Sequence, residues 1–239
     1  MSWLSKLWNL LLNCLFVRKC VGCGRLVDVH EPYAVCCDCA AKLAGEGQTV
    51  SGSRYYVQAV SAVPYDGCIR TAMCKFKFEN QRYLGDTFAA LLYQRVRDMA
   101  LMQRIDLVIC VPMHARRERY YNQSAVIAKA FARMAQLAFD ETVLEKPRHL
   151  PPLSHMGRSE RMQAVYGAFC VRGSADISGK TIALVDDIFT SGATTGECAR
   201  VLKARGAKAV YVLTPCYAID KNYHNRMTKA VNNSRETNL

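Results

Sequence analysis

The feature that most limits how this chain can fold is a short apolar segment followed by acidic and hydroxyl-bearing residues. Ile182 to Val185 is uniformly apolar, which is typical of a central strand covered on both faces. Asp186 and Asp187 follow directly, and the turn 190–194 reads Thr-Ser-Gly-Ala-Thr before a predicted helix at 195–205. Because ligands of open parallel sheets bind at the carboxyl ends of the strands, we expect these residues to face a pocket.

Strand-like and helix-like segments alternate along the chain around this motif. Strands are predicted at 56–63, 106–111, 141–144, 168–171, 181–185 and 209–213, and helices at 82–99, 123–138 and 195–205. This alternation predicts an α/β fold in which helices cover both faces of a parallel sheet.

The polar residues after the buried strand match the groups of a ribose 5-phosphate. Backbone N–H groups in the turn 190–194 and the positive end of the next helix favour a phosphate. Carboxylates repel a phosphate, so Asp186 and Asp187 are expected to accept hydrogen bonds from sugar hydroxyls, directly or beside a cation. Gly179-Lys180-Thr181 resembles the end of a P-loop, but Ser174 occupies the position of the first glycine that a P-loop requires. No G-x-G-x-x-G motif of dinucleotide-binding proteins occurs either.

Four cysteines near the amino terminus have metal-ligand spacing. Cys20 and Cys23 form one C-x2-C pair, and Cys36 and Cys39 form a second. Four thiolates at this spacing predict one structural Zn²⁺ in a closed tetrahedral site. Cys37 lies inside the second pair, so the sequence leaves open whether Cys36 or Cys37 is the ligand.

Composition divides the 239 residues into three parts. We expect an amino-terminal helix and cysteine module at 1–50, an α/β domain at 51–219 and a disordered tail at 220–239. The polar stretch 45–53 is expected to be the linker between the first two. The start of the chain lacks a secretory cleavage site and no segment is long enough to span a bilayer, so a cytoplasmic protein is expected.

The formal net charge is +12, which favours polyanionic partners. Nucleic acid and phosphorylated metabolites both satisfy this condition, and charge alone does not choose between them.

Segment 185–195 resembles the phosphoribosyl pyrophosphate motif of type I phosphoribosyltransferases. With a four-cysteine module before it, the chain resembles the ComF family of that fold. Segment 69–78, with Phe76-Lys77-Phe78, resembles the part before that family's first long helix. Segment 110–123 resembles its pyrophosphate loop and the Arg and Asn-Gln positions after it, and 158–169 resembles its flexible loop.

The resemblance implies a role for each part of the site. Asp186 and Asp187 would hold the ribose hydroxyls, and the turn at Val111 and Pro112 would face the pyrophosphate and its Mg²⁺. The 5′-phosphate would be held by Thr190, Ser191, Gly192, Ala193 and Thr194.

Basic residues are expected to compensate the charge of the leaving pyrophosphate. The candidates are Arg116, Arg119 and Arg161. Lys77 has two interpretations, a cation of the site or a strand lysine with an exposed ammonium group.

The sequence departs from the family pattern in two places. Leu153 follows Pro151-Pro152 where the family often has Gln, and the Asn commonly found after the arginine is absent from 161–165. These departures leave transferase activity open, whereas the central binding motif is intact.

Three functions are therefore weighed. The resemblance implies a phosphoribosyl pyrophosphate-binding protein of natural transformation that binds single-stranded DNA, with uptake-machinery partners such as a competence helicase. The alternative is an active phosphoribosyltransferase of nucleotide metabolism, with a purine or pyrimidine base or another nitrogen acceptor. Such an enzyme works by positioning and electrostatics, so the lack of a conspicuous nucleophile does not exclude it. A structural adaptor would bind neither ligand.

Overall fold

The computed structural model describes residues 18–27, 34–36, 38–39, 46–113, 120–147 and 158–219. The expected amino-terminal helix, Cys37 and the expected tail lie outside these residues, as do Arg116 and Arg119.

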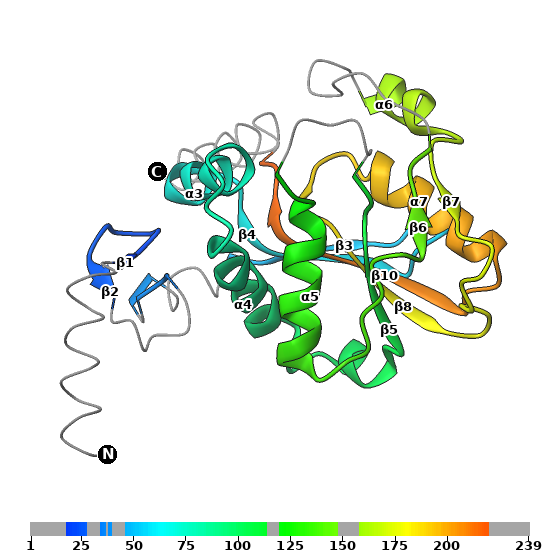
Figure 1. Ribbon diagram of the computed structural model, residues 1–239, viewed down its shortest axis with the longest axis horizontal. Helices are drawn as coiled ribbons and strands as arrows, with labels where there is room; N and C mark the ends of the chain where they lie inside the picture. Colours follow the sequence, from blue (N-terminus) through cyan, green and yellow to red (C-terminus); the bar gives the residue numbers. More distant parts are fainter. Residues whose placement is uncertain are drawn as a thin grey trace, which may run out of the picture.

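A central sheet organises the α/β part of the structure (Figure 1). Its strands, in spatial order, are β3 (Gln48–Ser51), β4 (Gln58–Pro64), β10 (Ala209–Tyr217), β8 (Thr181–Val185) and β5 (Leu107–Cys110). Strands β4, β10, β8 and β5 are parallel, and β9 (Ile188–Phe189) pairs with the end of β10. The carboxyl ends of β5, β8 and β10 therefore lie together, and we call this end of the strands the carboxyl edge of the sheet.

The sheet differs from the predicted parallel sheet at one edge, where β3 pairs with β4 in the antiparallel direction. Part of the expected linker thus forms a strand that spans positions 48–51. Most of β3 is exposed, so its polar composition resembled that of a linker. The boundary at residue 50 stays a prediction.

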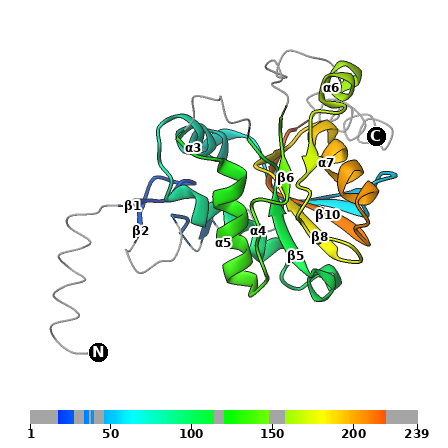
Figure 2. The ribbon, with the colours of Figure 1, turned by 45° about the vertical axis from the view of Figure 1, so that its right-hand side comes forward.

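Helices cover both faces of the sheet (Figures 1 and 2). On one face pack α3 (Gly67–Phe78), α4 (Leu84–Val96) and α5 (Gln123–Ala135), and on the other packs α7 (Ala193–Ala204). Strand β8 contributes side chains to the hydrophobic core on each face of the sheet. Ala183 and Val185 lie in the core beneath α3, α4 and α5, and Ile182 and Leu184 lie in the core beneath α7. All five of its residues are buried, as expected for a central parallel strand.

One segment for which no element was predicted is helical, and two expected strands are shorter than predicted. Segment 69–78 lies in helix α3, which begins where the Asp66 side chain accepts the Gly67 N–H at 2.8 Å. The strands expected at 141–144 and 168–171 are reduced to β6 (Leu144–Glu145) and β7 (Cys170–Val171), which pair with each other outside the main sheet. Two short elements complete this part, the 3₁₀ helix η1 (Ala100–Arg104) and helix α6 (Arg158–Val165).

The cysteine module is attached to the helical layer by a buried hydrogen bond. Its hairpin strands are β1 (Arg18–Lys19) and β2 (Leu26–Val27). Ala34, only 1% exposed, belongs to the core beneath α3, α4 and α5. Its N–H donates to Oγ1 of Thr87 on α4 at 3.0 Å, and its carbonyl accepts the Val21 N–H at 2.9 Å.

This attachment predicts the effect of Thr87→Val, which keeps the side-chain shape but removes the acceptor. The Ala34 N–H would be left buried without a partner, so the free energy of unfolding should fall by about 1–3 kcal/mol in urea denaturation. Thr71→Val is the matched control, because the exposed Thr71 hydroxyl donates only to Gly67 of its own helix. An equal loss in both variants would contradict the role of Thr87.

Candidate functional site

Backbone hydrogen bonds join β8 to both of its neighbours, β5 and β10, where Asp186 follows β8. The Val111 N–H donates to the Val185 carbonyl at 2.9 Å, and the Asp186 N–H donates to the Leu213 carbonyl at 3.1 Å. Val111 is buried and Pro112 is half-buried. The structure therefore brings the expected start of the pyrophosphate loop beside the acidic pair.

Asp186 is half-buried and is held from the start of α5. Its Oδ1 accepts from Ser124 Oγ and from the Asp187 N–H, each at 2.9 Å. The N-cap residue of α5, Asn122, accepts the Ser124 N–H and donates to the Val111 carbonyl, both at 3.1 Å. One helix start thus positions both the carboxylate and the adjoining loop.

The surroundings of Asp186 disfavour its charged form. Burial, followed by the negative charge of Asp187, raises the pKa of Asp186 to about 7. Hydrogen bonds from the Asp187 N–H and Ser124 and the charge of Lys77 oppose this shift. Near neutral pH the carboxyl group therefore exists in both protonation states.

Asp187 is paired with a lysine from a distant part of the sequence. Its Oδ2 lies 2.7 Å from Lys77 Nζ, and the two side chains are only 17% and 13% exposed. Lys77 lies in helix α3, so its interpretation as a strand lysine with an exposed ammonium group is wrong. A sheltered ion pair of this kind fixes the direction of the Asp187 carboxylate.

The turn leads into α7 at a glycine in the left-handed region, and the helix begins at Ala193, two residues before its expected start. Gly192 has φ of +74° and is the N-cap of α7. A Cβ on Gly192 would lie 3.2 Å from the Phe189 ring and 3.4 Å from the Tyr56 hydroxyl, so glycine suits this position in both conformation and space. The first N–H groups of α7 have no intrahelical acceptors, which makes this end of the helix a favourable place for an anion.

Around this turn, Thr190 is exposed, whereas Ser191, Ala193 and Thr194 are half-buried. The chain order places the turn directly after β9, at the same edge as Asp186 and Asp187. The turn and the two aspartates therefore lie at the same end of the parallel strands, and the binding of a phosphate by this turn stays a prediction.

The segment after α6 is fastened to α7 by a buried glutamate. Glu197, 6% exposed, accepts the Gly167 N–H at 2.8 Å and forms a two-point ion pair with Arg200 at 2.8 and 2.7 Å. The Arg200 guanidinium lies 4.9 Å from the centre of the Tyr166 ring. Arg161 lies half-buried on α6, which packs against α7, so the expected flexible-loop cation is on the α7 side of the sheet.

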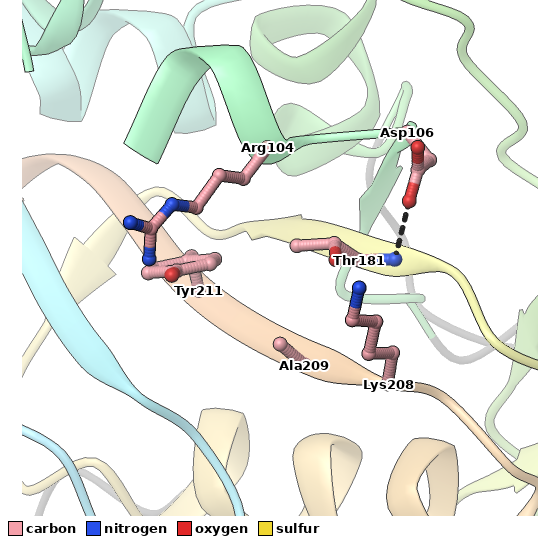
Figure 3. A pocket seen from close by; sticks show the side chains of 6 residues that line it. All are labelled: Arg104, Asp106, Thr181, Lys208, Ala209 and Tyr211. Atoms are coloured by element: carbon pink, nitrogen blue, oxygen red, sulfur yellow. Dashed lines mark hydrogen bonds between the residues drawn. The ribbon is translucent and has the colours of Figure 1, made fainter. Parts of the chain in front are cut away.

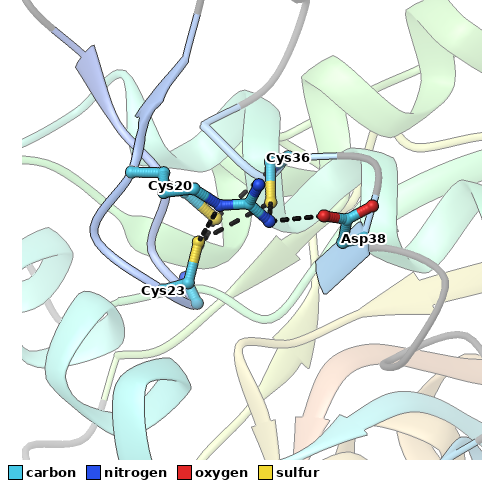
Figure 4. Close-up of polar contacts among 6 residues, drawn as sticks. Cys20, Cys23, Cys36 and Asp38 are labelled. Atoms are coloured by element: carbon cyan, nitrogen blue, oxygen red, sulfur yellow. Dashed lines mark hydrogen bonds and ion pairs between the residues drawn. The ribbon is translucent and has the colours of Figure 1, made fainter.

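The four predicted metal ligands come together. The sulfur atoms of Cys20, Cys23, Cys36 and Cys39 all lie within 4.8 Å of one another. Figure 4 shows three of these cysteines, Cys20, Cys23 and Cys36. Cys36 thus completes the cluster formed by the described cysteines, and Cys37 lies outside the described residues. A Cβ on Gly22 would lie 2.6 Å from Cys39 Sγ, so this turn requires glycine.

Arg25 lies beside the cluster and favours thiolates. Its Nε is 3.4 Å from Cys23 Sγ, and its guanidinium also pairs with Asp38 (Figure 4). The hydrogen bond from Arg25 is the main reason why the pKa of Cys23 is lowered to about 6. In the part of the chain that the structure describes, this is the one group of three or more His, Cys, Asp or Glu side chains arranged to hold a metal ion.

A separate cavity lies at the opposite edge of the sheet (Figure 3). It has a volume of about 400 Å³ and is lined by Arg104, Asp106, Thr181, Lys208, Ala209 and Tyr211. Asp106 is already held there by the Thr181 N–H at 2.7 Å. None of the expected ligand-binding residues lines this cavity, so we place the candidate site at the carboxyl edge, where the polar groups converge.

Ser124 is a site residue that the sequence did not indicate, and for Lys77 the sequence left two interpretations open. The Asn-Gln-Ser run at 122–124 is a helix-start signal, and it could have suggested that Ser124 faces the site. No sequence rule connects Lys77 with Asp187, because their contact depends on how α3 packs beside the sheet.

Within the described ranges, no helix is long and apolar enough to cross a membrane.

Comparisons with known proteins show which family the chain matches. The family model of the phosphoribosyl transferase domain matches residues 78–237. Competence protein F of Haemophilus influenzae is 28% identical over 144 residues, which cover 58% of this chain and 63% of that protein. The chain thus spans less than two thirds of that relative. DNA utilization protein YhgH of Salmonella typhimurium is 26% identical over 206 residues, covering 82% of this chain and 89% of that one.

Among solved structures, adenine phosphoribosyltransferase from Thermoanaerobacter pseudethanolicus is 12% identical, covering 75% of this chain and 97% of that one. The TM-score between the two structures is 0.39.

The raised pKa of Asp186 predicts a pH-dependent effect of Asp186→Asn. The folded protein keeps this proton up to about pH 7, whereas an unfolded aspartate loses it near pH 4. Stability therefore falls as pH rises between these values, and an amide avoids that loss. We expect the variant to exceed the wild type in free energy of unfolding at pH 8, with the difference shrinking towards pH 4.

Asp187→Asn is the contrasting control. It leaves Lys77 half-buried without its partner, so it should lower the stability at pH 8. Urea denaturation at both pH values measures both variants, and a pH-independent difference for Asp186→Asn would contradict the assignment.

Proposed function

The chain belongs to the phosphoribosyl transferase domain family and, within that fold, to the ComF family, and we propose that it binds phosphoribosyl pyrophosphate. The observation that carries this proposal is the oriented carboxylate pair beside the start of α7. Ser124 holds Asp186 and Lys77 holds Asp187, next to a turn suited to a phosphate.

Each part of the ligand has a matching group. Asp186 and Asp187 accept hydrogen bonds from the ribose hydroxyls, and the turn 190–194 binds the 5′-phosphate through backbone N–H groups and hydroxyls. The pyrophosphate lies beside Val111 and Pro112. Its compensating cations are Arg116, Arg119 and Arg161.

Magnesium suits the oxygen-rich character of this site. Mg²⁺ takes oxygen ligands and is usually bound by one or two carboxylates together with substrate phosphates. Asp186 Oδ2 has no hydrogen bond from the described part of the chain, so it is available to the ion, directly or through a water molecule. When bound, the ion neutralises pyrophosphate charge.

The cysteine cluster is proposed to hold a structural Zn²⁺. Four thiolates close the coordination sphere, so the ion has no open position for chemistry. Because Ala34 of this module is bonded to Thr87, the ion stabilises a part of the protein that contacts α4.

The biological role is proposed from the relatives. The names competence protein F and DNA utilization protein YhgH support a role in natural transformation and DNA uptake. There the protein would bind single-stranded DNA in the cytoplasm, with an uptake-machinery protein such as a competence helicase as partner. The net charge of +12 is consistent with a nucleic-acid partner.

Calorimetric titration with phosphoribosyl pyrophosphate and Mg²⁺ tests the ligand site. We expect saturable binding to the wild type, and at least a hundredfold weaker binding, roughly, to the double variant Asp186→Asn, Asp187→Asn, since two charge-assisted hydrogen bonds are weakened. Asp176→Asn is the matched control, because its side chain is 83% exposed and lies before β8. Unchanged affinity in the double variant would exclude this site, and no binding to the wild type would exclude the proposed ligand.

Metal analysis by mass spectrometry tests the zinc proposal. The purified protein should contain one Zn²⁺ per chain, and Cys20→Ser should lose it, because a hydroxyl is a poor replacement for a thiolate ligand. Cys170→Ser is the control, since Cys170 is an exposed cysteine outside the cluster. Full zinc content in Cys20→Ser would contradict the four-cysteine site.

A further inference from the structure

Three exposed aromatic side chains lie on segments that meet where α3, α4 and α5 adjoin. Phe78 ends α3 and is 64% exposed, Tyr83 precedes α4 and is 53% exposed, and Tyr120 shortly precedes α5 and is 77% exposed. We call these three residues, with Lys75 and Arg82, the aromatic corner. Exposed apolar surface rimmed by polar or charged residues is typical of interaction sites.

Tyr121 connects the segments of the aromatic corner. Its ring centre lies 5.5 Å from that of Phe76, and its hydroxyl donates to the Phe76 carbonyl. The Arg82 guanidinium lies 5.6 Å from the centre of the same Tyr121 ring. The exposed residues adjoin these contacts in sequence, because Phe78 is on the same helix end as Phe76. Both ribbon views show α3 beside the start of α5 (Figures 1 and 2).

The charges of the aromatic corner favour an anion. Lys75 and Arg82 are exposed, and neither forms a salt bridge with any residue of the described ranges. Glu79 is the neighbouring acid on this segment, so the two cations leave net positive charge. Lys77 does not add to it, since its charge is matched by Asp187.

We propose that the aromatic corner binds single-stranded DNA. Bases stack on Phe78, Tyr83 and Tyr120, and Lys75 and Arg82 contact the phosphates. Alternating rings and cations are the groups by which proteins bind single strands without sequence preference. Duplex DNA cannot stack its bases on these rings, because its bases are already paired and stacked on one another. The inference rests on the proposed role in DNA uptake and adds the surface that performs it.

This surface adjoins the candidate ribose-phosphate site. Phe78 is the next residue after Lys77, whose ammonium group lies 2.7 Å from Asp187. The binding groups of the aromatic corner are distinct from those assigned to phosphoribosyl pyrophosphate. The two binding activities can consequently be separated by mutation.

Fluorescence anisotropy with a labelled oligo(dT) of about 15 nucleotides tests the stacking interactions, since this length suits a single binding surface. The double variant Phe78→Ala, Tyr120→Ala should bind oligo(dT) more weakly, by about fivefold or more for each ring removed. Tyr166→Ala is the matched control, because Tyr166 is also 64% exposed but lies beside α7. It should bind as the wild type does.

The salt dependence of the same titration tests the interactions with phosphates. Lys75→Gln with Arg82→Gln should reduce the slope of log affinity against log salt by about 1.4, or about 0.7 for each phosphate that is no longer neutralised. Arg104→Gln with Lys208→Gln is the control, since these exposed cations line the cavity at the opposite edge of the sheet. It should leave the slope unchanged.

The outcomes separate this inference from the proposed ligand site. The aromatic double variant should keep its affinity for phosphoribosyl pyrophosphate and its unfolding midpoint, which shows that the fold is intact. Wild-type affinity for oligo(dT) in that variant, or equal affinity of the wild-type protein for duplex DNA, would overturn the inference. No binding of oligo(dT) to the wild type would refute both the DNA role and this surface, while the calorimetric result would still decide the ligand site.

Discussion

Mutual repulsion between Asp186 and Asp187 is the constraint around which the candidate site is built. Two adjacent carboxylates at the end of a buried strand cannot both be charged without compensation. Asp187 is compensated by Lys77 from α3, and Asp186 by the Ser124 hydroxyl from α5 and by a pKa raised to about 7. Helices on one face of the sheet are therefore tied to the edge where the ligand is proposed to bind.

The rest of the helical layer supports these interactions. Asn122 starts α5 and also holds the Val111 carbonyl, so the helix start and the loop after β5 have a fixed relation. Helix α4 packs against α5 and receives the hydrogen bond from Ala34 of the cysteine module. A metal ion in that module would consequently stabilise the helices that position the carboxylates, although it lies outside the ligand site.

The ligand site and the aromatic corner share α3 but use different residues. Lys77 faces the carboxylates, whereas Phe78 faces solvent one residue later. If both proposals hold, this arrangement reconciles a phosphoribosyl transferase fold with relatives named for competence and DNA utilization. The proposed site for a phosphorylated ribose and the proposed platform for a single strand would then occupy neighbouring parts of one molecule.

Local sequence determined the elements whose signals lie within a few residues. The strand 181–185, the turn before α7 and the two C-x2-C pairs were predicted because apolar runs, glycine and paired cysteines act over short separations. Tertiary structure decided the contacts between segments that are distant in sequence. Lys77 reaches Asp187 and Ser124 reaches Asp186 only because α3 and α5 pack on the same face of the sheet. The antiparallel edge strand β3 likewise depends on pairing with β4, since its own exposed polar residues carry no strand signal.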